Sequence, residues 1–152
     1  MKGVAKASMH LRKRFMLLLG SAYRQLYRVP VAGDAAVRAM GKGIALLGRC
    51  SPYRMRDGAS AGALKRDLER ALKAMDIDFQ ELRESEGKLE LVLARCPYGF
   101  DRPEHAGVCD AAMEQDRAML RYVGASLTIE ESIPEGATAC RVFIYPSGLS
   151  ER

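Results

Sequence analysis

The stretch that decides the fold runs from Ile77 to Cys96 and reads IDFQELRESEGKLELVLARC. Before this stretch, apolar residues recur at the spacing of an α-helix, whereas within it they alternate, as is typical of β-strands. The alternation predicts strands over 77–84 and 88–96, joined as a hairpin by the turn Ser85–Lys88. Leu89, Leu91 and Leu93 then share one face of the second strand.

The residues that follow extend this hairpin into a sheet. The pattern predicts a helix from about Ala106 to Val123, and then two strands over about 126–133 and 138–145 around the turn Pro134–Ala137. Runs of strands that flank a helix favour an antiparallel sheet over a parallel one. We therefore expect an α+β fold in which N-terminal helices precede a ββαββ antiparallel-sheet domain.

Two shorter helices are expected ahead of the sheet. One runs over 35–47 with Asp34 as its N-cap, and the other runs from Ser60, as N-cap, to about Met75. The chain then divides into three parts. These are a basic amphipathic helical arm over 1–30, a helical segment over 31–75 that packs on the domain, and the ββαββ ligand- or metal-binding domain over 76–148.

The arm holds the excess positive charge of the chain. The net charge is +5, but residues 1–33 contain seven basic and no acidic residues, so the remainder has a net charge of −2. We predict a helix with one apolar face that ends at Pro30. The face favours packing on the domain or dimerisation, hence a homo-oligomer, over binding to a membrane surface or to nucleic acid. Its predicted members are Leu11, Phe15, Leu18, Leu19, Ala22, Leu26 and Val29.

Targeting signals and membrane spans are not expected. The apolar run over 15–20 is shorter than the core of a signal peptide, and no run approaches the roughly 20 apolar residues of a membrane span. We therefore expect a soluble, cytoplasmic protein. In that compartment the four cysteines are thiols or ligands rather than structural disulfides.

Three cysteines lie where a strand end, a helix start and a strand interior can converge at one corner of the sheet. They are Cys96, Cys109 and Cys140, and His105 precedes Cys109 by one helical turn. A Cys₃His set suits zinc or an iron–sulfur cluster. Taken singly, each cysteine is also a common core residue, and His105 alone is expected at the surface.

A second interpretation of the same residues needs no metal. Cys109 becomes a reactive thiol with His105 as its base, and Asp110 orients a ligand or transfers a proton. Tyr98 and Met113 are candidate ligand contacts, because a flexible methionine suits the wall of a small-molecule pocket. A plain helical core explains Met113 equally well.

Residues 77–146 also resemble a small cysteine-containing ligand-binding domain. In that domain a strand ending in Cys-Pro precedes a cysteine-bearing helix and a closing strand pair. Three families look like this: L-2-amino-thiazoline-4-carboxylic acid hydrolase-like proteins, four-vinyl-reductase-type hydrocarbon-binding domains, and the iron–sulfur sensor domain of winged-helix repressors. The matching residues are Cys96-Pro97-Tyr98, Val108-Cys109-Asp110, Ile129 to Gly136, and Cys140-Arg141-Val142-Phe143.

Each resemblance implies a different function. The hydrolase-like family implies the opening of a cyclic amidine-like ring, with its site around Cys96, Cys109 and Asp110. The hydrocarbon-binding domains imply a small-molecule pocket, often without catalysis. The repressor sensors imply a cluster held by cysteines, but this chain departs from them. It has no recognisable winged helix in residues 1–75, and Ser132 stands where a further cysteine is expected.

The function we expect first is a sensor or accessory domain that binds a small molecule or a metal. Cys96, Cys109 and Cys140 are its ligands or line its pocket, with His105 and Asp110 assisting. The alternative is a hydrolase of the thiazoline-carboxylate type that acts on a C–N bond, with Cys109 or Asp110 catalytic. A second alternative is a structural or partner-binding protein that acts through its N-terminal helix.

Overall fold

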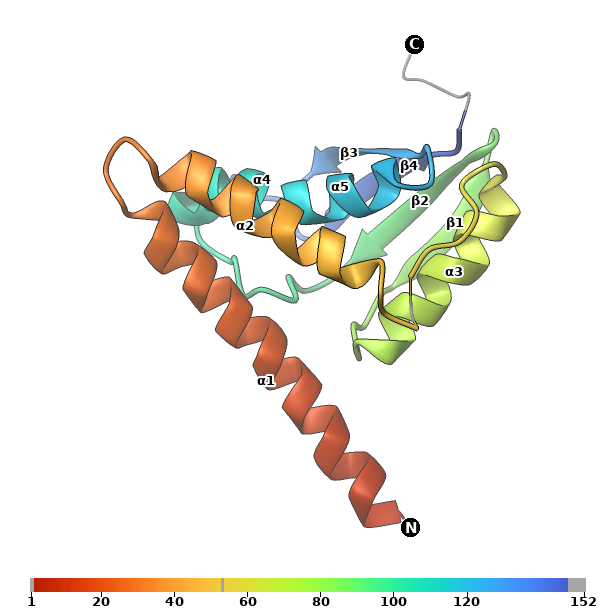
Figure 1. The fold of residues 1–152 in the computed structure, drawn as a ribbon, viewed down its shortest axis with the longest axis horizontal. Coiled ribbons are helices and arrows are strands. Elements are labelled where there is room, and N and C mark those ends of the chain that lie inside the picture. Colours follow the sequence, from red (N-terminus) through yellow and green to blue (C-terminus); the bar gives the residue numbers. More distant parts are fainter. Residues whose placement is uncertain (1, 53, 148–152) are drawn as a thin grey trace.

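A four-stranded antiparallel sheet with helices on one side forms the body of the molecule (Figure 1). The computed structural model describes residues 2–52 and 54–147, with side chains from residue 12 onward. The strands are β1 (Glu81–Ser85), β2 (Lys88–Leu93), β3 (Ser126–Glu131) and β4 (Cys140–Tyr145), in the order β1-β2-β4-β3. Three helices precede the sheet, and α4 (Ala106–Ala112) and α5 (Glu114–Arg121) lie between β2 and β3, which confirms the α+β fold class.

The predicted hairpin is present. Glu86 and Gly87 have φ values of 53° and 76°, the left-handed pair that a two-residue hairpin turn requires. The strands are shorter than predicted, because β1 begins at Glu81 and β2 ends at Leu93. The last pair between β2 and its neighbour joins Leu93 to Cys140, where β4 begins. Residues 94–96 therefore have no partner strand and leave the sheet as a loop.

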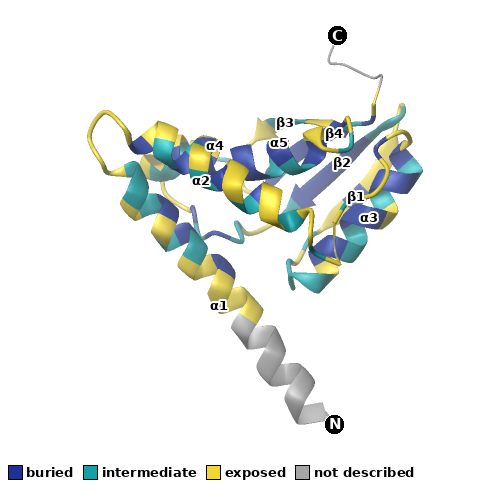
Figure 2. Cartoon of the chain, viewed as in Figure 1, coloured by how far each residue is buried: buried dark blue, intermediate teal, exposed yellow. Residues whose placement is uncertain are grey.

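The register of the sheet aligns its apolar side chains in rows. Leu82 pairs with Leu91, Leu91 with Val142, and Val142 with Ile129. This apolar face packs against α3 (Ala61–Ala74) and α5 (Glu114–Arg121) in one buried cluster (Figure 2). The opposite face carries charge, and the carboxylate of Glu90 accepts hydrogen bonds from Arg83 and Arg141. The face that forms the apolar cluster is therefore the one that the helices cover.

The helices on that side follow local sequence signals. In α3, the hydroxyl of Ser60 accepts the N–H of Ala63 at 3.2 Å, which confirms the predicted N-cap. The helix α2 (Gly33–Gly48) begins one residue before the predicted cap Asp34 and packs on α5. The single helix expected over 106–123 is instead α4 (Ala106–Ala112) and α5, which meet at Met113. Short 3₁₀ turns at 103–105 and 133–135 precede α4 and β4.

The long helix α1 (Lys2–Tyr27) docks with a different face from the predicted one. Met16 and Tyr23 are buried, whereas Phe15 and Leu18 are 62% and 69% exposed. The prediction was wrong because apolar residues occupy most of the helix circumference at 15–19, and docking rather than periodicity selects the buried side. Of the other predicted members, Ala22 and Val29 are exposed, Leu19 and Leu26 are half-buried, and the side chain of Leu11 lies outside the described residues.

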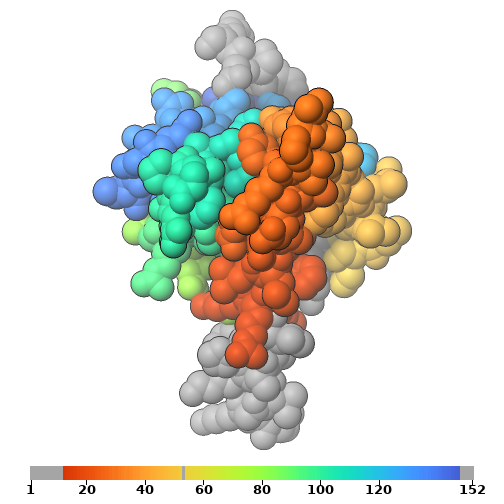
Figure 3. Space-filling view, turned by 90° about the vertical axis from the view of Figure 1, so that its left-hand side faces the viewer, coloured from red at the N-terminus to blue at the C-terminus, as the bar shows by residue number. Residues whose placement is uncertain are grey.

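The docked half of α1 contributes to a second buried cluster. Tyr23 and Met16 pack there with Val37 of α2 and with residues of the loop after β2 and of α4. Figure 3 shows α1 and α2 side by side with the segment around residue 105 on one surface of the molecule. At the other end of the described part, Arg12 donates to the carbonyl of Ala74 and Lys13 pairs with Asp78. These contacts tie α1 to the junction between α3 and β1.

The described part of the chain contains no helix with the length and apolar character needed to cross a membrane.

Candidate functional site

A cavity of about 660 Å³ lies between the two buried clusters, on the helical side of the sheet. We call it the interior cavity. Residues of all five α-helices line it, together with the 49–56 linker, the loop after β2, and strands β2, β3 and β4. The cavity exists where the first cluster, centred on the sheet, does not close against the second, centred on α1 and α4.

Three thiols from separate elements face this cavity. Cys96 lies in the loop after β2, Cys109 in α4, and Cys140 at the start of β4, and all three line the interior cavity as free thiols. Cys50, the remaining cysteine, is exposed in the linker. The sequence placed Cys96 at the end of a strand, whereas its position after that strand is what turns it toward the other two.

Burial makes these thiols poor nucleophiles. It raises the pKa of all three, and that of Cys109 to about 12. Backbone N–H groups act in the opposite direction. Those of Phe100, Tyr98 and Gly99 lower the pKa of Cys96, and the N–H of Ile133 donates to the sulfur of Cys140 at 3.4 Å. The net pKa of each thiol stays above its ordinary value, so at neutral pH the cavity is lined by protonated thiols.

Alkylation should separate the cysteines by environment. With iodoacetamide at pH 7.5, we expect Cys50 to react first and Cys109 to react at least about 100-fold more slowly, because only the thiolate attacks. Cys96 should be intermediate. Peptide mass spectrometry at timed quenches gives the four rates. A Cys109 that reacts faster than Cys50 would contradict this placement and favour a catalytic thiol.

The predicted Cys₃His set does not assemble. His105 does not line the interior cavity. Its ring packs near that of Phe100, at 6.0 Å between centroids, and its Nδ1 lies 3.6 Å from Asp101. Within residues 2–52 and 54–147, no three His, Cys, Asp or Glu side chains are grouped as a metal site. As placed here, the cysteines and His105 do not fit zinc or an iron–sulfur cluster.

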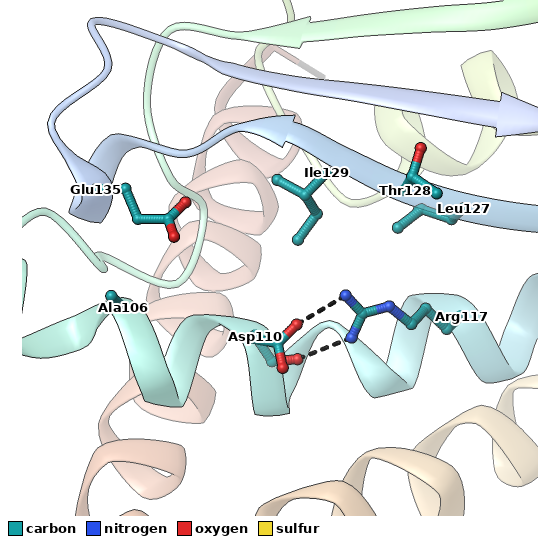
Figure 4. Close-up of a pocket in the computed structure, with 7 residues that line it drawn as sticks. All are labelled: Ala106, Asp110, Arg117, Leu127, Thr128, Ile129 and Glu135. Carbon is teal, nitrogen blue, oxygen red and sulfur yellow. Dashed lines mark hydrogen bonds and ion pairs between the residues drawn. The ribbon is translucent and has the colours of Figure 1, made fainter. Parts of the chain in front are cut away.

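Asp110 also points away from the interior cavity. It lines a separate, smaller cavity together with Arg117 and Glu135 (Figure 4). Its carboxylate accepts a hydrogen bond of 2.7 Å from Arg38 and one of 2.8 Å from Arg117. Partial burial raises the pKa of Asp110, but the two guanidinium groups outweigh it and hold that pKa below its ordinary value. The sequence-predicted role of Asp110 in orienting a ligand beside Cys109 therefore finds no support in this arrangement.

Tyr98 and Met113, the two predicted ligand contacts, do line the interior cavity. The ring of Tyr98 is buried and lies edge-on to that of Tyr23 and stacked on that of Phe100, with centroids 5.8 and 5.6 Å away. Met113 is one of five methionines in the lining, out of eight in the chain. Methionine side chains adapt to different shapes, so this wall can fit an apolar molecule without a rigid template. The other four methionines in the lining are Met16, Met55, Met75 and Met119.

One carboxylate in the cavity wall, that of Asp116, is not among the residues predicted from the sequence. Asp116 of α5 keeps some accessible surface because it borders the interior cavity, but protein surrounds it closely. This burial raises its pKa to about 6 against an ordinary 3.8, although the charge of Arg117 acts in the opposite direction. The sequence spacing of the methionines around Asp116 contained a signal for this position. Asp116 stands three residues after Met113 and three before Met119, which places it on the same face of the helix.

Comparison with known proteins adds no assignment to this site. No model of a known protein family matches the chain, and no curated protein matches it significantly. The family resemblances around Cys96, Cys109 and Cys140 stay expectations.

Proposed function

We propose that the protein binds a small, largely apolar molecule in the interior cavity and acts as a sensor or accessory domain. The observation that carries the proposal is the cavity itself. Its volume of about 660 Å³ falls within the range of about 300–1,000 Å³ that is usual for ligand pockets. Its lining is mainly aliphatic and methionine side chains with a few polar groups, which is the usual composition of such pockets.

The state of the thiols favours binding over catalysis. Cys96, Cys109 and Cys140 are protonated at neutral pH, and neither His105 nor Asp110 lies in the cavity wall to take a proton from them. The resemblance to hydrocarbon-binding domains agrees with this proposal. We also place the protein in the cytoplasm, because a reducing compartment keeps three neighbouring thiols free.

A cavity-filling variant tests the proposal. We expect a neutral polarity-sensitive dye such as Nile red to bind the protein saturably and to fluoresce more brightly in the apolar cavity. In Met113→Trp/Met119→Trp, two indole rings occupy part of the space, so the dissociation constant should rise at least about ten-fold. Fluorescence titration at equal protein concentrations gives both constants.

The matched control places the same indole rings outside the cavity. Leu46 and Leu47 of α2 are 54% and 74% exposed and do not line the interior cavity, so Leu46→Trp/Leu47→Trp should bind the dye as the wild type does. Circular dichroism establishes that both double variants are folded. Equal dye binding by the wild type and the Met113→Trp/Met119→Trp variant would place the dye elsewhere and overturn the proposal.

A further inference from the structure

The carboxylate of Asp116 lines the interior cavity without a partner. Among the residues that the structure describes, none forms a hydrogen bond or an ion pair with it. Its neighbour Gln115 is engaged, because its Oε1 accepts the hydroxyl of Tyr23 at 2.7 Å. Asp116 is only partly exposed, and a carboxylate in such a setting without a partner is costly, which makes it a candidate functional group.

The nearest cation does not compensate this charge. Arg117 follows Asp116 in α5, but its guanidinium bonds both the carboxylate and the main-chain carbonyl of Asp110. Arg117 therefore points into the small cavity of Figure 4, and its charge lowers the pKa of Asp116 only in part. Among the described residues, no cation pairs with Asp116 inside the interior cavity.

Two tyrosines interact electrostatically with the same carboxylate. The charge of Asp116 raises the pKa of both Tyr23 and Tyr98, after the larger effect of burial, so both phenols lie within its electrostatic reach. Tyr98 also lines the cavity. A carboxylate and a tyrosine ring in the wall of one cavity can together recognise an organic cation, through an ion pair and a cation–π contact.

Arginines also border the cavity, but at its solvent side. Arg49, Arg54 and Arg56 belong to the end of α2 and the linker after it, and all three are exposed. The guanidinium of Arg49 stacks on the ring of Tyr122, at 4.6 Å from its centroid. Solvent screens exposed charges, so these arginines contribute little to binding in the interior.

From this arrangement we infer that the ligand is an apolar molecule carrying one ammonium group, which pairs with Asp116 while the apolar part packs on the methionines. The inference rests on the proposed function and narrows it to a class of ligand. It also assigns Asp116 as the residue that selects the charge of the ligand, a role for which the thiols are not needed.

Three probes of the same size and different charge test it: 2-phenylethylamine, 2-phenylethanol and phenylacetate. Calorimetric titration at pH 8, where both Asp116 and an alkylamine are charged, gives their affinities. We expect the wild type to bind the amine roughly ten- to hundred-fold more tightly than the alcohol, because a charge-assisted hydrogen bond forms out of bulk water. In Asp116→Asn the affinity for the amine should fall to the affinity for the alcohol. The affinity for the alcohol should stay unchanged.

The control is Asp78→Asn, which removes a carboxylate that is 84% exposed and does not line the cavity. It should keep the preference for the amine. Equal binding of amine and alcohol, insensitive to Asp116→Asn, would overturn the ammonium inference and leave the proposed cavity binding intact. Tighter binding of phenylacetate would overturn the inference and would indicate that the arginines at the border of the cavity select the charge of the ligand. Failure of the amine, the alcohol and Nile red to bind would overturn both proposals.

Discussion

Replacing Asp116 by Asn is expected to stabilise the protein by about 2–3 kcal/mol at pH 8, with the gain disappearing near pH 4. Burial raises the pKa of Asp116 to about 6 from an ordinary 3.8. Each unit of such a shift corresponds to about 1.4 kcal/mol of unfolding free energy. Asn removes the ionisable group, so it removes the cost of keeping a charge in the cavity wall.

The direction of the pH dependence follows from proton binding. Between about pH 4 and pH 6, folded Asp116 holds a proton that the unfolded chain has already released. The free energy of unfolding of the wild type therefore falls as the pH rises through this window, and the loss is complete above about pH 7. The difference between variant and wild type is thus largest at high pH.

Urea unfolding followed by circular dichroism at pH 4.5, 6 and 8 measures this difference. Asp78→Asn serves as the control, because an exposed carboxylate paired with Lys13 should contribute less than about 1 kcal/mol. Should Asp116→Asn destabilise the protein equally at all three pH values, Asp116 would have a structural partner, and its role as an open ligand contact would be lost. A stabilising variant that loses amine binding is the signature of a residue kept for function rather than for stability.

Replacing Gly20 by Ala is expected to destabilise the protein by about 2–4 kcal/mol, although Ala is the better helix former. A Cβ atom at Gly20 would lie 2.0 Å from the carbonyl oxygen of Tyr98 and 2.8 Å from its carbonyl carbon. Both are backbone atoms, so no side-chain rotation relieves the clash and α1 must move away from the loop. That movement would expose Met16 and Tyr23 and open the cavity wall between α1 and Tyr98.

Gly43→Ala is the matched control. Gly43 lies inside α2 with no atom within 4 Å of a Cβ placed there, so the substitution should stabilise the protein by roughly 0.5–1 kcal/mol through helix propensity alone. Urea unfolding measures both variants, and Nile red titration should show weaker binding only for Gly20→Ala. A Gly20→Ala variant as stable as Gly43→Ala would mean that α1 does not dock on the loop after β2.

The structure also bears on the two functional alternatives that the sequence left open. The hydrolase alternative needs an ionised Cys109 or an available Asp110, and the structure offers a buried thiol and a carboxylate held by two arginines. The partner-binding alternative needs the exposed side of α1 and α2. Phe15, Leu18 and Leu47 are exposed there, and the predicted homo-oligomer through the N-terminal helices stays a prediction.

The sequence by itself determined the elements whose signals are local. Alternating leucines around the turn Ser85–Lys88 predicted the hairpin, and Ser60 predicted the start of α3; the structure confirms both. The α+β class follows from the order of these elements. Local signals suffice because turns, caps and strand alternation are contacts between residues a few positions apart.

Only the tertiary structure decided which residues share a site. Cys96 joins Cys109 and Cys140 because β2 ends early for want of a partner strand, and α1 is buried through Met16 and Tyr23 because Gly20 lets it approach Tyr98. Asp110 in α4 and Asp116 in α5 are only six positions apart, yet one is held by arginines and the other faces an apolar cavity. The chemistry of each carboxylate depends on the side chains that pack against its face of the helix. Many of those side chains belong to residues far away in the sequence.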